Sequence, residues 1–334
     1  QPKRYLAGAV VVGTVDQVLL SSLRVGHAHL RATALLRHLL VVDEVHASDA
    51  YMNRILEEVL RFHVAAGGHA FLMSATLGSH VRTRLECAAL GTARAREPLA
   101  AGLETPYPIL HHRPKASEPR RVAVATPGLP KRIRVSVEPV ADDALALALR
   151  ARDCAREGAR VLVLRNTVSD ALETQQALES LMEAGDDDLL LCVEGRRAVH
   201  HARFSREDRA VLDAAVEERF GRPEVRGAVL AIATQTVQQS LDLDADVLFT
   251  DLAPMDVLLQ RFGRLHRHRA RDPHRPAGFE RARAFVLTGA TDLSDAIRVN
   301  GEARGRHGVG TVYDDLCILE ATKRLLIERG AMVS

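Results

Sequence analysis

Four polar residues near the end of one predicted helix have the types and spacing needed to bind phosphate: Gln260, Arg261, Arg264 and Arg267. The helix itself is predicted by an apolar stripe spaced i, i+3, i+4, i+7, formed by Met255, Leu258, Leu259 and Phe262. The planar arginine fork binds two phosphate oxygens at once, which a lysine ammonium does not do. The alternative is a solvated basic helix, but the glycine at 263 and the three-residue spacing favour a phosphate-binding row.

A second candidate group is the acidic pair Asp43-Glu44, which directly follows the apolar run 39–42. That run is typical of a buried parallel strand. An aspartate at the carboxyl end of such a strand can hold Mg²⁺, usually through water, and the adjacent glutamate can activate a water that attacks a phosphate. Two acids can equally cap the following helix, so this pair alone does not decide between the two interpretations.

A third group, Ser74-Ala75-Thr76, follows the next predicted strand. Taken alone, the tripeptide is also compatible with a plain strand-to-helix turn. Its position gives it more weight, because the carboxyl ends of parallel strands are where such sheets bind ligands. Both the acidic pair and this tripeptide are therefore predicted to reach the same cleft.

These groups sit in an alternating pattern of strands and helices, which predicts α/β domains with parallel sheets. Strands are expected at 9–12, 39–42, 70–73, 160–164, 189–193, 228–233, 247–250 and 284–287. Helices are expected at 16–25, 48–64, 79–90, 141–156, 167–183, 205–220, 255–265 and 313–327.

The length of 334 residues suits two domains of about 150 residues each. Of the thirteen prolines, eight fall between Pro98 and Pro139, which predicts a linker over 98–140. The expected organisation is a first domain over 1–97, this linker, a second domain over 141–290 and a helical extension over 291–334. A ligand cleft is expected between the two domains.

Composition narrows the class of protein. An apolar fraction of 47% argues against global disorder, and no apolar run approaches the roughly 20 residues of a membrane span. The four cysteines form no C-x-x-C pair, which argues against a disulfide framework or a zinc site and fits a reducing cytoplasm. Eight arginines lie between Arg261 and Arg283, but lysine occurs only four times in the chain. Because lysine is scarce, codon bias toward arginine explains this density. Arginine density alone is therefore weak evidence for nucleic-acid binding.

The order VVDEVH, SAT and QRFGRLHRH over two α/β blocks resembles a superfamily 2 helicase. More narrowly, VGTVDQ, DEVHASDAYM and ATQTVQQSLDLDADVLFTDLAP resemble the helicase core of the CRISPR-associated helicase-nuclease of type I systems. The resemblance covers most of the chain and is weakest over 97–140. It implies two tandem RecA-like domains, ATP and Mg²⁺ as ligands, single-stranded DNA as substrate, and an RNA-guided surveillance complex as partner.

The resemblance also implies a role for individual residues. Asp43 would bind the metal, Glu44 would activate water, and Arg264 and Arg267 would be arginine fingers with Gln260 beside them. Residues that would couple the nucleotide site to the DNA site are His46, Ser74 and Thr76. Residues that would contact nucleotide or DNA are Thr14, Asn166, Thr167, Arg203, Thr234, Gln235, Asp242 and Arg261.

Two departures from the family pattern matter. The chain has no Gly-Lys dipeptide and so no G-x-x-x-x-G-K-[ST] phosphate loop. In relatives that loop precedes the equivalent of Thr14, so we expect a first domain truncated before Gln1 and a chain that is not active alone. The chain also lacks a His-Asp dipeptide, which would be a sign of a metal-dependent nuclease domain. A nuclease would therefore be fused outside this chain or separate.

Two alternatives stay open at this point. One is a superfamily 2 RNA helicase or a restriction-type translocase, because backbone contacts say little about the sugar. The other is a catalytically inactive chain that only binds nucleic acid or a partner.

Overall fold

A computed structural model describes residues 8–36, 38–45, 50–93, 97–115, 117–125, 131–186, 188–221, 227–238 and 241–333. The chain divides into unit 1, Gln1–Gly128, and unit 2, Leu129–Ser334. In the part of the chain that is described, no helix is long and apolar enough to cross a bilayer.

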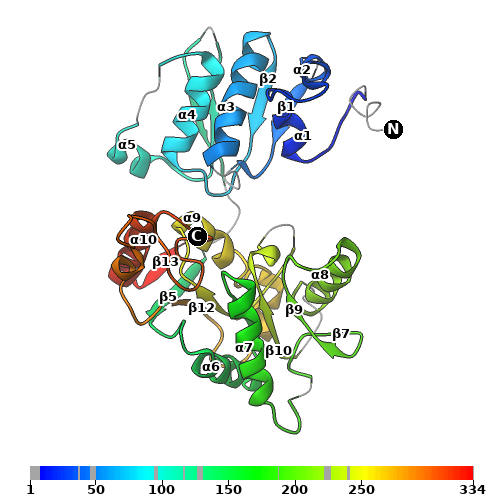
Figure 1. The fold of residues 1–334 in the computed structure, drawn as a ribbon, viewed down its shortest axis with the longest axis vertical. Coiled ribbons are helices and arrows are strands. Elements are labelled where there is room, and N and C mark those ends of the chain that lie inside the picture. The colour runs from blue at the N-terminus through cyan, green and yellow to red at the C-terminus, as the bar shows by residue number, and fades with distance from the viewer. Residues whose placement is uncertain are drawn as a thin grey trace. The chain divides into compact units, whose positions relative to one another are not determined.

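Unit 1 contains a sheet of two parallel strands, with helices before and after each strand (Figure 1). Strand β1 (Leu39–Val42) pairs in register with β2 (His69–Leu72). The helices are α1 (Val15–Leu19), α2 (Ala28–Leu35), α3 (Ala50–Ala65), α4 (Ser79–Leu90) and α5 (Leu99–Glu104). Strands β3 (Ile109–His112) and β4 (Arg120–Ala123) form a separate antiparallel pair. The predicted strand at 9–12 is wrong, because the described residues there form bends and irregular chain.

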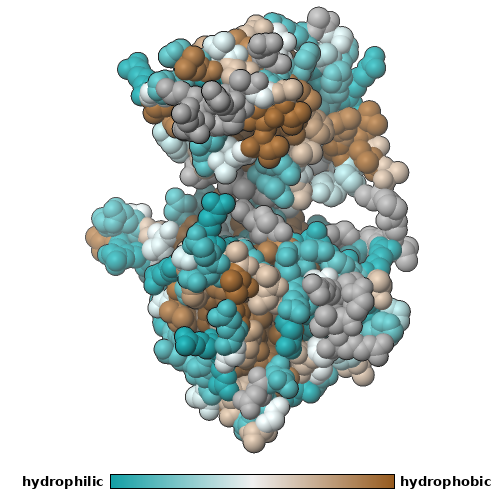
Figure 2. All heavy atoms as spheres, turned by 90° about the vertical axis from the view of Figure 1, so that its right-hand side faces the viewer, coloured by the Kyte–Doolittle hydropathy of each residue, from teal (hydrophilic) through white to brown (hydrophobic). Residues whose placement is uncertain are grey.

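The period of two along β1 decides which side chains enter the core of unit 1. Leu40 and Val42 are buried, and they pack with Leu56, Val59 and Leu60 of α3. The alternate residues Leu39 and Val41 are 61% and 50% exposed, and Phe71 of β2 is 42% exposed. Brown, hydrophobic groups accordingly appear on the surface of this unit in Figure 2. Among the described residues, one face of this small sheet is thus left uncovered.

Unit 2 contains a seven-stranded sheet in the order β13-β5-β12-β11-β6-β10-β9. Its strands are β5 (Arg132–Glu138), β6 (Arg160–Leu164), β9 (Val199–His200), β10 (Val229–Ala233), β11 (Val247–Asp251), β12 (Ala282–Leu287) and β13 (Ala331–Val333). All neighbours run parallel except β13, which pairs antiparallel with β5. A hairpin of β7 (Cys192–Val193) and β8 (Arg196–Arg197) lies outside it, so only the end of the predicted strand 189–193 forms one.

Helices cover both faces of this sheet, so its central strands are buried along their whole length (Figure 1). Val161 and Val163 of β6 pack with α6 (Ala144–Arg156) and α7 (Val168–Ser180). Leu162 and Leu164 pack with α8 (Arg206–Phe220), α9 (Met255–Phe262) and α10 (Leu316–Arg329). This is the arrangement of a RecA-like α/β domain.

The segment predicted as a linker, 98–140, is divided differently in the structure. Helix α5 and the β3–β4 pair belong to unit 1, whereas β5 is an internal strand of the unit 2 sheet. The predicted extension 291–334 is also part of unit 2, because Leu319 and Leu326 of α10 lie in its core and β13 joins its sheet. Proline content thus predicted that a boundary between two units lies within 98–140, but not that it lies between Gly128 and Leu129.

Candidate functional site

The two acids of unit 1 lie at the carboxyl end of β1, as the sequence predicted. Val45 N donates to Met73 O at 3.1 Å and Met73 N donates to Val42 O at 2.8 Å, so the ends of β1 and β2 are tied together. Asp43 and Glu44 are both exposed between the buried Val42 and Val45. Glu44 has φ 52°, an uncommon left-handed conformation for a side chain of this kind. The backbone thus projects two adjacent carboxylates outward.

The donor chemistry at this strand end fits Mg²⁺. Asp43 Oδ1 accepts a hydrogen bond from Glu44 N at 2.8 Å, which orients the carboxylate. Asp43 as a whole is exposed to solvent. Mg²⁺ prefers hard oxygen ligands and is usually held by one or two carboxylates together with water and substrate phosphates. Asp43 is the residue that would hold the ion, with Glu44 next to it.

The end of β2 carries the serine and threonine that the sequence singled out. Thr76 N donates to Ser74 Oγ at 3.3 Å, which forms a tight turn next to the Asp43 strand end. The Thr76 Oγ1 atom is buried and, within the described ranges, has no hydrogen-bond partner. Thr14 is exposed and precedes α1, with its carbonyl accepting from Gln17 N. His46 lies outside the described residues.

Arg261 is a structural residue, which corrects its predicted contact with nucleotide or DNA. Its side chain is 0% exposed, and all five N–H donors are used within the protein. The acceptors are Gln238 Oε1 at 3.0 Å, Thr250 Oγ1 at 2.6 Å, Asp251 O at 3.1 Å, Asn166 Oδ1 at 3.0 Å and Tyr313 Oη at 3.1 Å. No donor is left for phosphate, so Arg261 instead joins α9 to four other segments of unit 2.

Replacing Arg261 with lysine is expected to destabilise unit 2 by roughly 3 kcal/mol, because several buried acceptors lose their donors. Chemical denaturation of the 334-residue chain measures this change. The matched control is Arg267→Lys in the same row, where the side chain is 46% exposed and a loss of at most about 1 kcal/mol is expected. Equal effects of the two substitutions would contradict the structural assignment.

The other members of the row lie at or beyond the end of α9. The helix ends at Phe262, so Arg264 lies in the turn that follows, where it donates to the carbonyls of Leu241 and Gln238. Arg267 Nε lies 2.8 Å from Asp242 Oδ1, and both side chains are about half exposed. Gln260 is half-buried in the last turn of the helix. Within this row, Arg264 and Arg267 are thus less buried than Arg261.

Asn166 is also internal, which corrects its predicted place along the DNA strand. Its amide donates to Leu252 O and His307 O, both at 2.9 Å, and its side-chain oxygen accepts from Arg261. The neighbouring Thr167 caps α7, accepting from Asp170 N at 3.1 Å. Both residues thus have structural partners, and Thr167 is half-buried.

Thr234 and Gln235 follow β10 and connect to the same interior. Thr234 is 3% exposed and its N donates to His200 O at 2.9 Å. Gln235 Nε2 donates to Asn166 O at 2.7 Å. The segment after β10 is therefore hydrogen-bonded to Asn166, and through Asn166 to Arg261 of α9.

Arg203 is exposed in the loop before α8, a position open to phosphate. The same loop places the His201 ring against Phe204, with centroids 4.4 Å apart and nearly parallel planes. Asp242, predicted to touch nucleotide or DNA, is exposed and paired with Arg267 and with His268 Nε2 at 3.1 Å. A ligand that bound Arg267 would compete with this carboxylate.

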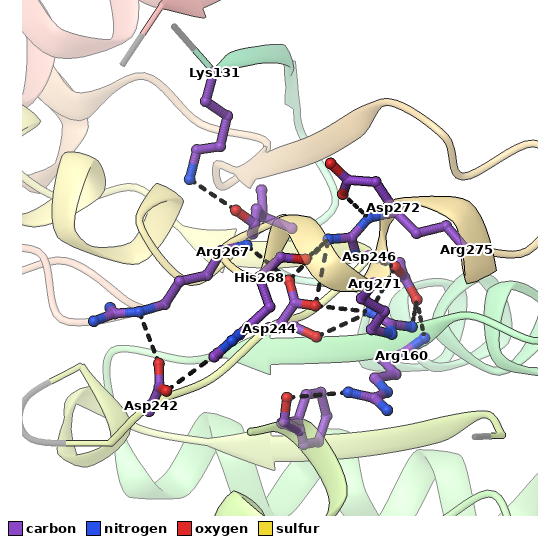
Figure 3. A network of polar contacts seen from close by, with 12 residues as sticks. Lys131, Arg160, Asp242, Asp244, Asp246, Arg267, His268, Arg271, Asp272 and Arg275 are labelled. Atoms are coloured by element: carbon purple, nitrogen blue, oxygen red, sulfur yellow. Dashed lines mark hydrogen bonds and ion pairs between the residues drawn. The ribbon is translucent and has the colours of Figure 1, made fainter. Parts of the chain in front are cut away.

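The sequence did not reveal a buried ion network next to residues 263–268, the arginine turn (Figure 3). Arg271 and Arg275 each pair with both Asp244 and Asp246, at 2.6 to 3.3 Å, and all four residues are at most 8% exposed. Burial raises the pKa of Asp244, but Arg275 and Arg271 outweigh it and keep the pKa below its ordinary value. Of the eight arginines between Arg261 and Arg283, three are thus internal, namely Arg261, Arg271 and Arg275. The alternation LDLDAD before β11 was the available signal, since Asp244 and Asp246 are buried together with Leu241 and Leu243, whereas Asp242 is exposed.

A second missed cluster surrounds His307. Its Nδ1 lies 3.1 Å from Asp170 Oδ1 and its Nε2 lies 3.1 Å from Asp142 Oδ1. Burial lowers the pKa of His307, but the two carboxylates outweigh it and raise the pKa above its ordinary value. Arg165 and Asp251, both 1% exposed, form an ion pair at 3.0 Å behind it. The cluster anchors the segment after residue 300 to the carboxyl ends of the strands.

Comparisons with known proteins agree with this architecture. Residues 157–270 match the family described as CRISPR-associated nuclease/helicase Cas3, C-terminal. The Cas3 endonuclease/helicase of Escherichia coli K12 is 36% identical over 98% of this chain and 34% of its own length. The chain thus spans about a third of the length of the curated relatives it matches.

Solved structures give the same result. The T. fusca Cas3–ATP structure superimposes with a TM-score of 0.80 at 29% identity, over 100% of this chain and 37% of that one. A chain of a CRISPR RNA-guided surveillance complex, pre-nicking, matches with a TM-score of 0.74 at 29% identity, over 99% of this chain and 40% of that one. From one end to the other, the chain therefore resembles the superfamily 2 helicase core of the Cas3 nuclease/helicases.

Proposed function

We propose that this chain is the ATP-hydrolysing helicase core of a CRISPR interference protein, which moves 3′ to 5′ along single-stranded DNA and unwinds target DNA. The observation that carries the proposal is the match along the whole chain to Cas3 structures, one of them with ATP. The surveillance-complex neighbour supports an RNA-guided complex as the partner that recruits it. A nuclease activity would come from outside this chain.

In the proposed reaction a water attacks the γ-phosphorus of ATP, the bond to the β–γ bridging oxygen breaks, and ADP and phosphate are released. Glu44 takes the proton of that water, and Asp43 would hold Mg²⁺. When bound, the ion supplies positive charge to the phosphate oxygens. Arg264 and Arg267 offset the charge that develops on the transferring phosphoryl group, with Gln260 beside them. For Arg264 this requires exchange of its contacts with the carbonyls of Leu241 and Gln238.

Coupling of ATP to DNA is supported by the hydrogen bonds inside unit 2. Gln235 donates to Asn166, Asn166 accepts from Arg261, and Arg261 lies in α9 one turn before Arg264. A shift of the segment after β10 would reach the arginine turn through the half-buried Gln235 and the buried Asn166 and Arg261. Ser74, Thr76 and the exposed Arg203 and Thr14 are proposed to act at the DNA or on its coupling to ATP.

The DNA contact predicts a steep dependence of binding on salt in the full-length protein. For about four phosphate contacts, the affinity for a labelled deoxythymidine oligomer should fall roughly 50-fold between 50 and 200 mM salt. Fluorescence anisotropy measures it. Arg203→Ala should make the slope shallower by about 0.7, whereas Arg206→Ala, an exposed control at the start of α8, should not. A flat salt response contradicts a groove that binds the phosphate backbone.

The nature of the strand is tested by measuring ATP hydrolysis in the presence of DNA or RNA. Single-stranded DNA should stimulate ATP hydrolysis more than RNA of the same sequence. Greater stimulation by RNA would identify an RNA helicase, and absence of hydrolysis with either strand would identify a binding protein without ATPase activity.

A further inference from the structure

Lys131 is the third residue of unit 2 and lies immediately before β5. It contacts the carboxyl end of α9 and the turn that follows. Its Nζ donates to Phe262 O at 3.0 Å and to Leu265 O at 2.7 Å. Figure 3 shows its side chain reaching from the start of the strand down to this turn. The two contacts join residues more than 130 positions apart, so neither hydrogen bond follows from local sequence.

The segment that Lys131 holds is the arginine turn, defined here as residues 263–268. The last carbonyls of a helix have no amide partner within the helix, and a cation placed there also interacts favourably with the helix dipole. Two further backbone contacts fix the turn, Ala245 N to Arg264 O at 2.9 Å and His266 N to Ala245 O at 3.0 Å. Lys131 supplies a side-chain contact on either side of Arg264.

We infer that Lys131 is a positioning residue for ATP hydrolysis, which sets the orientation of the arginine turn and hence of Arg264 and Arg267. The inference rests on the proposed function. Because unit 1 ends at Gly128, the chain enters unit 2 three residues before this contact. Lys131, the first described residue of unit 2, therefore ties the start of this unit to the turn that carries the arginines.

The charge of Lys131 is sensitive to pH near neutrality. Burial lowers its pKa to about 8, with Arg267, Arg275 and Arg264 acting in the same direction and Asp244 opposing them. Asp244 stays ionised between pH 7 and 9, because Arg275 and Arg271 keep its pKa below its ordinary value. Below pH 8 the group is an ammonium with three donors, and above it the group becomes an amine with two. The helix end thus loses its cation as pH rises, so kcat should decline on the alkaline side.

The test uses the full-length protein and its DNA-stimulated ATPase. Lys131→Met should lower kcat about ten- to a hundredfold, the scale of a small misplacement of a catalytic group, with KM for ATP changed less than about twofold. Lys131→Arg should restore most of kcat and remove the decline above pH 8, because arginine stays charged. The control is Arg132→Met, which removes one exposed charge next in sequence and should leave kcat and its pH profile unchanged.

Glu44→Gln separates this inference from the proposed function. If the wild type hydrolyses ATP and Glu44→Gln does not, the proposed function stands, and an unchanged kcat in Lys131→Met overturns only the role of Lys131. If the wild type shows no turnover, both proposals fail. Should Lys131→Met not fold, the comparison of wild type with Lys131→Arg decides, because identical pH profiles overturn the inference.

Discussion

Replacing Glu44 with glutamine in the full-length protein should abolish measurable ATP turnover while ATP binding is retained. Glutamine keeps the shape of the side chain but cannot accept the proton of the attacking water, and general-base catalysis contributes about 10²- to 10⁴-fold. Turnover is measured by phosphate release in the presence of single-stranded DNA, and binding by titration with a fluorescent ATP analogue.

The structure makes this a sharp test of chemistry, because the substitution changes no buried group. Glu44 is exposed, and its left-handed backbone belongs to the turn that follows β1. The control is Glu104→Gln, an exposed glutamate at the end of α5, where turnover should stay at the wild-type level. Retained turnover in Glu44→Gln would assign the base elsewhere, and lost ATP binding would make Glu44 a binding residue.

The central strands of unit 2 could be predicted closely from sequence, for a physical reason. Strands β6, β10 and β11 are covered on both faces and therefore consist of uninterrupted apolar runs. The predicted limits 160–164, 228–233 and 247–250 lie within one residue of those observed. The run at 9–12 has the same composition but no described neighbouring strand to pair with, so composition alone predicted it wrongly.

The site was harder to predict, because the roles of its arginines depend on contacts distant in sequence. The polar residues of the row 260–267 would lie along one helix only if that helix extended to residue 267, but α9 ends at Phe262. Arg261 then falls inside the core, where Thr250, Asn166 and Tyr313 accept its hydrogen bonds. The burial of the aspartates before β11 likewise depends on arginines that approach from η4 (Arg269–His274) and beyond. Spacing predicted the candidate site, but it did not separate the internal Arg261 from the less buried Arg264 and Arg267.

Arg264→Ala should lower kcat for ATP hydrolysis by about 10³-fold or more, the scale of an arginine finger. The guanidinium would offset charge present mainly in the transition state, so KM for ATP should change much less than kcat. Steady-state kinetics of the full-length protein with single-stranded DNA at saturation measure both constants. A fall of less than tenfold would make Arg264 a structural residue.

A structural role is a real competitor here, because Arg264 already donates to the carbonyls of Leu241 and Gln238. Loss of those contacts alone would lower stability and leave kcat of the folded protein largely intact. A thermal unfolding curve recorded on the same preparation therefore separates the two roles. Arg264→Lys sharpens the test, since it keeps the charge but not the planar fork. If the fork acts on the phosphoryl group, lysine should restore stability more fully than kcat, whereas equal recovery of both would favour the structural role.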